Sequence, residues 1–195
     1  MTEERKRLFK GAFNLPNSIS FIRLLLAIPF YITLSQLHSS PYARYYVIGL
    51  ILLAFFTDIL DGFIARKKKL VTEFGKIIDP LADKALVILI VVQLYFLDEI
   101  PGVYFWILLL RDIIIFFGGI FLSRKIGKVL PSNLLGKITV LSIGFFFLSI
   151  LFELDPTNFI YRFLFYISII LSFASVIAYA LRGYEAIKWK NNESI

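Results

Sequence analysis

Four aspartates at regular spacing are the residues of this chain that most clearly indicate chemistry. They lie in the pattern D-x2-D-G-x2-A-R-x8-G-x3-D-x3-D, between two apolar runs, and are Asp58, Asp61, Asp79 and Asp83. Carboxylates at membrane depth are costly unless cationic partners accompany them. Carboxylate oxygens without His or Cys donors suit hard cations such as Mg²⁺ or Mn²⁺. We therefore predict that the four acids bind two divalent metal ions.

A metal site of this kind also indicates the class of substrate. Mg²⁺ completes its coordination with water and substrate phosphates, so the acids predict a phosphate-bearing substrate. One alternative is a pair of interhelical salt bridges, for instance with Lys84 and Arg66. A second alternative, from a different class of function, is a divalent cation transporter. The transporter is disfavoured because no polar residues continue a path through the remainder of the two spans.

Small and basic residues lie between the two acidic pairs. Gly62 and Ala65 share the acidic face and leave room for a ligand, although small residues also serve helix packing. Arg66 can form a fork of hydrogen bonds with a diphosphate, or can extend to the lipid headgroups instead. Gly75 is expected to open the next helix, where exposed N–H groups favour anions, but a turn glycine would look the same.

The elements that must position these residues are predicted to be membrane helices. The chain has 195 residues, of which 58% are hydrophobic, and these form several runs long enough to cross a bilayer. We predict one domain over residues 1–195, an all-α integral membrane protein with six transmembrane helices. The absence of cysteine excludes disulfides and thiolate chemistry. The expected spans are 18–37, 45–66, 76–97, 103–123, 134–154 and 159–181.

The basic residues indicate how these helices are oriented. They gather near both termini, in the connector at 66–76 and around 124–128, whereas the opposite loops carry Asp98, Glu99, Glu153 and Asp155. The positive-inside rule places the basic side, and therefore both termini, in the cytoplasm. Residues 1–14 mix charges with apolar residues, which predicts a short amphipathic juxtamembrane helix. By the helical rise, all four aspartates then lie in the cytoplasmic half of the bilayer.

Basic residues outside the acidic stretch indicate a second phosphate site. Arg111 lies well inside the fourth span beside Asp112, so it must face protein or a polar cavity. A structural pairing of Arg111 with Asp112 is the alternative, although adjacent helix residues point to different faces. Lys137, Lys125 and Arg182 are further candidates for binding an acceptor phosphate, and Lys125 and Arg182 also fit a role at the membrane surface alone.

These segments together resemble a known family. The stretch DILDGFIARKKKLVTEFGKIIDPLAD resembles the signature of the CDP-alcohol phosphotransferases, with all four acids in place. FNLPNSISFIR is similar to a segment of the branch that contains phosphatidylglycerophosphate synthases and eukaryotic-type cardiolipin synthases, with Ser20 where Thr is usual. LLLRDIII and LLGKITV are also similar to segments of that branch, although a Lys-Thr pair often found after the second is missing.

The resemblance implies roles for individual residues. It implies that Asp58, Asp61 and Asp79 bind the metals together with Asp83, and that Asp83 is the general base toward the acceptor hydroxyl. It implies a homodimer and a bound CDP-diacylglycerol, and it raises Arg111 and Lys137 as acceptor residues. The residues expected to hold the cytidine diphosphate portion are Gly62, Ala65, Arg66, Thr72 and Gly75.

A phosphate pocket for the acceptor favours glycerol 3-phosphate over a neutral alcohol. Our leading hypothesis is transfer of the phosphatidyl group from CDP-diacylglycerol to glycerol 3-phosphate with release of CMP. Cardiolipin synthesis, with phosphatidylglycerol as acceptor, is the nearest alternative, and phosphatidylinositol phosphate synthesis is a further one. We expect membrane lipids and no nucleic acid as partners. The expected location is a bacterial inner membrane, with the active site facing the cytoplasm.

Overall fold

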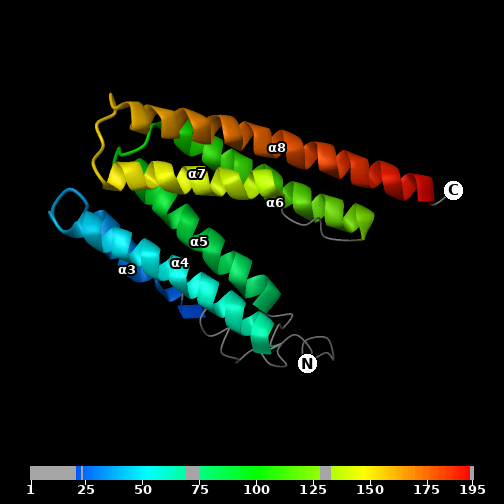
Figure 1. Ribbon diagram of the computed structural model, residues 1–195, viewed down its shortest axis with the longest axis horizontal. Helices are drawn as coiled ribbons and strands as arrows, with labels where there is room; N and C mark the ends of the chain where they lie inside the picture. Colours follow the sequence, from blue (N-terminus) through cyan, green and yellow to red (C-terminus); the bar gives the residue numbers. More distant parts are fainter. Residues whose placement is uncertain (1–20, 23, 69–74, 128–132, 194–195) are drawn as a thin grey trace. The chain divides into compact units, whose positions relative to one another are not determined.

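The protein is all-helical in the part of the chain that the structure describes. The computed structural model describes residues 21–22, 24–68, 75–127 and 133–193, with side chains except at 58, 61–68, 75–83 and 191–193. The all-α prediction is confirmed for these ranges, and the predicted interfacial segment 1–14 lies outside them. The helices are α3 (Ala27–Ser35), α4 (Ala43–Lys68), α5 (Gly75–Phe96), α6 (Gly102–Ile126), α7 (Leu134–Leu151) and α8 (Phe159–Glu193) (Figure 1).

The second to sixth predicted helices begin within two residues of their expected starts. Hydropathy locates them because each apolar run begins after a polar or proline-containing connector. Asn133 caps α7, since its side-chain oxygen accepts a hydrogen bond from the N–H of Gly136 at 2.7 Å. Asn158 caps α8 in the same way, through the N–H of Ile160 at 2.8 Å. These two helix starts therefore follow from local sequence.

The first predicted helix, 18–37, is described in part. Residues 21–22 and 24–25 are helical, Leu26 forms a turn, and α3 follows. Pro29 explains the interruption, because it has no N–H to donate to the carbonyl of Leu25. The N–H of Phe30 still reaches the Leu26 carbonyl at 3.0 Å, so the chain continues in helical form beyond the turn.

Three helix ends lie three or more residues from the predicted ones. Helix α6 continues to Ile126 and not only to Ser123. We expected the last helix to stop at Leu181, but α8 continues to Glu193 through a charged sequence that hydropathy does not mark. Helix α7 ends at Leu151 and not at Leu154, because Glu153 adopts a left-handed φ of 54°. The N–H of Leu154 then bonds to the Ser149 carbonyl at 3.0 Å, a bond typical of the Schellman helix end.

Among the residues that the structure describes, three helices are long and apolar enough to cross a membrane: α6, α7 and α8 up to Lys190. Shorter apolar stretches occupy Ala43–Thr57 of α4 and Lys84–Phe96 of α5, counted over the side chains that the structure describes. By length and composition, these three helices are candidate membrane spans. The count of six spans and the orientation of the termini remain predictions.

The helices form two compact units, Met1–Glu99 and Ile100–Ile195. In the first unit, α3 packs against both α4 and α5, and the latter two run in opposite directions (Figure 1). Glu99, in the loop after α5, contacts the loop before α4 and the start of α4. Its carboxylate lies 3.1 Å from His38 Nε2 and accepts a hydrogen bond from Arg44 at 2.7 Å. The prediction that the chain is one domain stays a prediction.

In the second unit, α8 packs against both α6 and α7. An aromatic cluster fills its core, where the ring of Tyr104 lies 4.8 Å from that of Phe146 and 5.2 Å from that of Phe165. The Tyr104 hydroxyl lies 2.9 Å from the hydroxyl of Ser168, which itself donates to the Phe165 carbonyl. A buried phenol thus has a partner for its O–H in an apolar interior.

Candidate active site

The four aspartates lie on two helices that run in opposite directions. Asp58 and Asp61 belong to α4, and Asp79 and Asp83 belong to α5, so the predicted helical placement is confirmed. Residues three or four apart share one helix face. Each pair therefore lies on one face of its helix. The side chains of all four lie outside the described residues, and their convergence on a common point stays a prediction.

The residues expected to hold the cytidine diphosphate surround this position in the sequence. Gly62, Ala65 and Arg66 lie in the last turns of α4, and Gly75 is the first residue of α5, as predicted. Thr72 lies outside the described residues. Among the side chains that the structure does describe, no three acidic, His or Cys residues gather in a group able to hold a metal ion.

Arg111 is the charged side chain most buried in the described part of the second unit, with 9% of its surface exposed. Its Nε donates to the hydroxyl of Ser175 on α8 at 3.2 Å. Its Nη1 donates to Asp112 Oδ1 at 2.7 Å, so the pairing that we held as the alternative is present. The argument that adjacent residues face apart does not exclude this pairing, because the long arginine side chain reaches the carboxylate of its neighbour, which is 34% exposed.

The polar contacts between α6 and α8 fix how these two helices run. Tyr104 meets Ser168, and Arg111 meets Ser175, so both residue numbers rise together and the helices are parallel. Further along α6, a Cβ atom added at Gly119 would lie 3.0 Å from the hydroxyl oxygen of Tyr179 on α8. Glycines at 118, 119 and 183 thus allow close approach of α6 and α8 beyond Arg111, as small residues do between membrane helices.

Lys137 lies near the level of Arg111 in this bundle. The hydroxyl of Thr139 is buried and lies 3.1 Å from the Leu171 carbonyl, which sets the register of α7 on α8. Lys137 precedes Thr139 by two residues and Ser175 follows Leu171 by four. With a rise of about 1.5 Å per residue on antiparallel helices, Lys137 and Ser175 lie within about 3 Å of the same level. The Lys137 side chain is exposed.

Lys125 and Arg182 lie further along the same pair of helices. Lys125 is 14 residues beyond Arg111 on α6, or about 21 Å along the axis. Its ammonium group lies over the ring of Phe121, 5.9 Å from the centroid, and its carbonyl accepts from Lys190 at 2.8 Å. Arg182 lies on α8 next to Gly183, which packs on Leu122. The structure thus separates Lys125 from Arg111.

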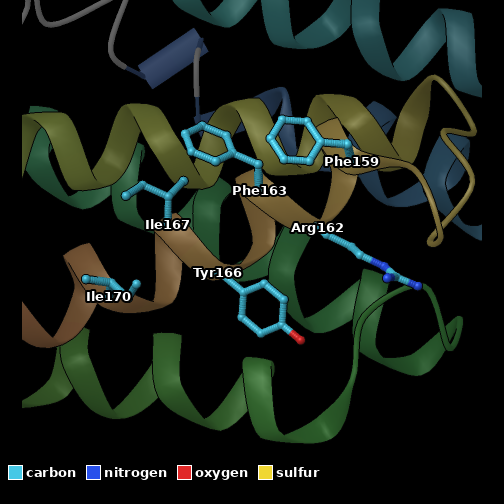
Figure 2. Close-up of a pocket in the computed structure, with 6 residues that line it drawn as sticks. All are labelled: Phe159, Arg162, Phe163, Tyr166, Ile167 and Ile170. Atoms are coloured by element: carbon cyan, nitrogen blue, oxygen red, sulfur yellow. The ribbon is translucent and has the colours of Figure 1, made fainter.

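A shallow groove on α8 has a different character. Figure 2 shows its six lining side chains, all extending from α8 and mostly apolar. Phe159, Phe163 and Ile170 are more than half exposed. Such a mostly apolar surface suits hydrocarbon. The lining residues are Phe159, Arg162, Phe163, Tyr166, Ile167 and Ile170.

Sequence reasoning did not single out the serines of α8. Ser168, Ser172 and Ser175 are all buried, at 0%, 1% and 2% exposure. Their spacing of four and three residues places them on one helix face, toward α6. In the sequence, the signal for these serines is their spacing within an apolar run. The role of Ser175 becomes evident only from its contact with Arg111, which is 64 residues away in the sequence.

Comparison with known proteins adds an independent finding. The family model for CDP-alcohol phosphatidyltransferase matches residues 13–178. The chain is 33% identical over 182 residues to the CDP-diacylglycerol–glycerol-3-phosphate 3-phosphatidyltransferase of Aquifex aeolicus, covering 89% of this chain and 98% of that protein. The match thus includes both units of the fold.

Two further relatives match shorter segments. A Rickettsia bellii protein with the same name is 47% identical over 91 residues, which is 45% of this chain and 49% of that protein. A protein of Drosophila melanogaster named probable cardiolipin synthase (CMP-forming) is 35% identical over 118 residues, 56% of this chain and 36% of that protein.

Proposed function

The chain belongs to the CDP-alcohol phosphatidyltransferase family, and on this premise we propose that it transfers the phosphatidyl group of CDP-diacylglycerol to glycerol 3-phosphate. The observation that carries the proposal is the similarity to the Aquifex aeolicus enzyme, which covers 98% of that protein. The buried Arg111 supports a phosphate-bearing acceptor, because a charged group in an apolar span indicates a functional site.

The aspartates of α4 and α5 fit a site for two hard divalent cations. Four carboxylates paired on two helices supply oxygen donors and about four negative charges, without the His or Cys donors that favour Zn²⁺. We assign Asp58, Asp61, Asp79 and Asp83 to two Mg²⁺ or Mn²⁺ ions. Such ions, when bound, offset the negative charge of the diphosphate and of the CMP that leaves.

The residues of the chain then have separate roles in the transfer. Asp83 accepts the proton of the acceptor hydroxyl as the oxygen attacks the phosphorus that carries the diacylglycerol. A new bond forms between the acceptor oxygen and this phosphorus, the bond to the CMP oxygen breaks, and CMP departs with both bonding electrons. Gly62, Ala65, Arg66, Thr72 and Gly75 hold the cytidine diphosphate portion.

Arg111 and Lys137 are the residues that we assign to the acceptor phosphate. Arg111 has five N–H donors, of which two are bonded to described residues, so it retains donors for a phosphate. Lys137 lies near its level on α7. We place Lys125 and Arg182 in a supporting role nearer the membrane surface, because Lys125 is about 21 Å along α6 from Arg111.

Cardiolipin synthesis remains the second candidate, favoured by the Drosophila melanogaster relative of that name. Its acceptor, phosphatidylglycerol, offers a phosphodiester where glycerol 3-phosphate offers a phosphate monoester. A monoester carries more negative charge and more terminal oxygens, which suits the unused donors of a buried arginine better. We therefore rank glycerol 3-phosphate first.

We propose that six helices span the membrane with the active site on the cytoplasmic side. Arg124 and Lys125 end α6, whereas the loop after α5 carries Asp98 and Glu99. In that loop region Arg44 is neutralised by Glu99, which leaves little net positive charge. A bacterial inner membrane is the proposed location, since the relative that is covered over most of its length comes from the bacterium Aquifex aeolicus. A homodimer remains a prediction from the family resemblance.

The proposal is tested with purified protein, CDP-diacylglycerol and radiolabelled glycerol 3-phosphate. We expect label to enter the lipid fraction with equimolar release of CMP. EDTA should abolish the reaction, and Mg²⁺ or Mn²⁺ should restore it. Absence of labelled lipid in the presence of either metal ion would contradict the proposed acceptor, and full activity in EDTA would contradict the metal assignment.

A further inference from the structure

The hydroxyl of Ser175 connects the backbone of α8 to Arg111 by two hydrogen bonds. The hydroxyl of Ser175 donates its one proton to the Ser172 carbonyl at 2.8 Å. Its oxygen is therefore left as an acceptor, and it receives the Nε–H of Arg111 at 3.2 Å. The bond has one possible direction, because arginine is a donor only. The backbone of α8 thus determines where the hydroxyl lone pair points.

This contact restrains a guanidinium that would otherwise have much freedom. Arginine is long, and its planar group recognises phosphate well only when its orientation is set beforehand. Ser175 holds the Nε edge and Asp112 holds Nη1 at 2.7 Å, so the plane of the group is defined from two sides. Within the described residues, the remaining N–H groups of Nη1 and Nη2 have no protein partner, which leaves them for a ligand.

We propose that Ser175 is a positioning residue for acceptor recognition: it orients Arg111 so that the unbonded N–H groups meet the acceptor phosphate. This inference rests on the proposed function, in which Arg111 binds that phosphate. Ser175 does not touch the substrate. Its effect is on the affinity for the acceptor and not on the chemical step.

A purely structural role for Ser175 makes a different prediction, and Ser172 provides the matched control. Ser172 is equally buried, lies one turn earlier on the same face, and donates to the Ser168 carbonyl at 2.7 Å. Its side chain does not contact Arg111, and removing it leaves the Ser172 carbonyl in place for Ser175. Replacement of either serine by alanine therefore removes one buried hydroxyl from α8, but only one replacement releases Arg111.

The experiment compares Ser175→Ala, Ser175→Thr and Ser172→Ala in the full-length purified enzyme. We expect Ser175→Ala to raise KM for glycerol 3-phosphate about tenfold, the effect of losing one hydrogen bond to a charged group. Its kcat and its KM for CDP-diacylglycerol should stay within about twofold of wild type. Ser175→Thr keeps the hydroxyl and should restore most of the affinity, and Ser172→Ala should leave all three constants near wild type.

Two outcomes would overturn the inference. One is an unchanged acceptor KM in Ser175→Ala. The other is an equal rise in Ser172→Ala, which would indicate loosening of α8 in general. The protection that inorganic phosphate gives against thermal unfolding is measured in the same variants. If the wild-type enzyme does not use glycerol 3-phosphate, the proposed function fails, and a loss of phosphate protection in Ser175→Ala alone still decides the role of Ser175.

Discussion

The two units of this protein carry functional information in different ways. In α3–α5 the residues that define the chemistry are dense in sequence, with four acids within 26 residues at fixed spacing. In α6–α8 no comparable motif is present, but buried polar contacts run along the α6–α8 pair, from Tyr104 and Ser168 to Arg111 and Ser175. The proposed chemistry is thus indicated by the spacing of residues in the sequence, and the proposed acceptor site by the packing of helices.

This difference has a physical basis. Two carboxylate pairs on helix faces can be recognised from spacing alone, because the helical repeat fixes which residues share a face. A guanidinium in an apolar bundle depends on partners from other helices, which lie far away in the sequence. We therefore expect substitutions in the first unit to affect the reaction step and substitutions in the second to affect acceptor binding and stability.

The largest expected effect is in the first unit. Asp83→Asn removes the proposed general base and should lower kcat about 10³-fold. The measurement is CMP release under saturating substrates. Asp98→Asn is the control, because Asp98 lies in the loop after α5 and not on the acidic faces of α4 and α5. Its φ of 57° is a left-handed conformation that asparagine also tolerates. If Asp83→Asn kept more than a tenth of the wild-type kcat, the expectation that substitutions in the first unit affect the reaction step would be contradicted.

Arg111→Lys should have the next largest effect, and of a different kind. Lysine keeps the charge but loses the Nε donor that meets Ser175 and the forked geometry that suits phosphate. We expect the KM for glycerol 3-phosphate to rise about 10- to 100-fold, while the KM for CDP-diacylglycerol stays unchanged. Arg162→Lys is the control, because Arg162 is exposed in the first turns of α8. Equal rises in both KM values would contradict a separate acceptor site.

Substitutions at two glycines test how much the packing of α8 against α6 contributes to stability. Gly183→Ala places a methyl group 2.6 Å from Leu122 Cδ1 between α8 and α6, and should lower the free energy of unfolding by about 1–3 kcal/mol. Gly49→Ala on α4 meets nothing within 4 Å, and should be neutral or slightly stabilising through helix propensity. Thermal unfolding in detergent measures both. The double variant with Leu122→Ala should recover part of the loss.

The smallest expected effect concerns a loop outside the helices. Hydrogen bonds from the side chain and N–H of Thr157 hold the pKa of Asp155 below its ordinary value. The stabilisation is thus present above the ordinary pKa of about 3.9 and is lost as pH falls through the lowered value. Asp155→Asn should lower Tm by about 1–2 °C at pH 7, because the group is exposed. The difference in Tm between Asp155→Asn and wild type should vanish in acid. A difference that grows as the pH falls would contradict the stabilising role of the Asp155 carboxylate.

Much of the fold follows from the sequence, and the failures have identifiable causes. Five helix starts were predicted closely because apolar runs and capping residues such as Asn133 mark them. The extension of α8 to Glu193 was missed because hydropathy does not register a helix that continues in charged sequence. Its end contacts α6 instead, through the bond from Lys190 to the Lys125 carbonyl.

The candidate site divides in the same way. The helical placement of Asp58, Asp61, Asp79 and Asp83 follows from their spacing and surrounding apolar residues. The pairing of Arg111 with Asp112 was named as an alternative, whereas its contact with Ser175 could not be predicted, because Ser175 becomes meaningful only when α6 and α8 are known to be parallel. The separation of Lys125 from Arg111 follows from counting residues along α6, once that helix is known to be continuous from Gly102 to Ile126.

The central claim is tested most directly by the lipid that the purified enzyme makes in a mixture of acceptors. CDP-diacylglycerol is supplied with Mg²⁺ and equal concentrations of glycerol 3-phosphate and phosphatidylglycerol, and the products are identified by mass spectrometry. We predict phosphatidylglycerophosphate as the main product, with one CMP released per molecule. Cardiolipin as the main product would contradict the proposed acceptor and would assign Arg111 to a phosphodiester.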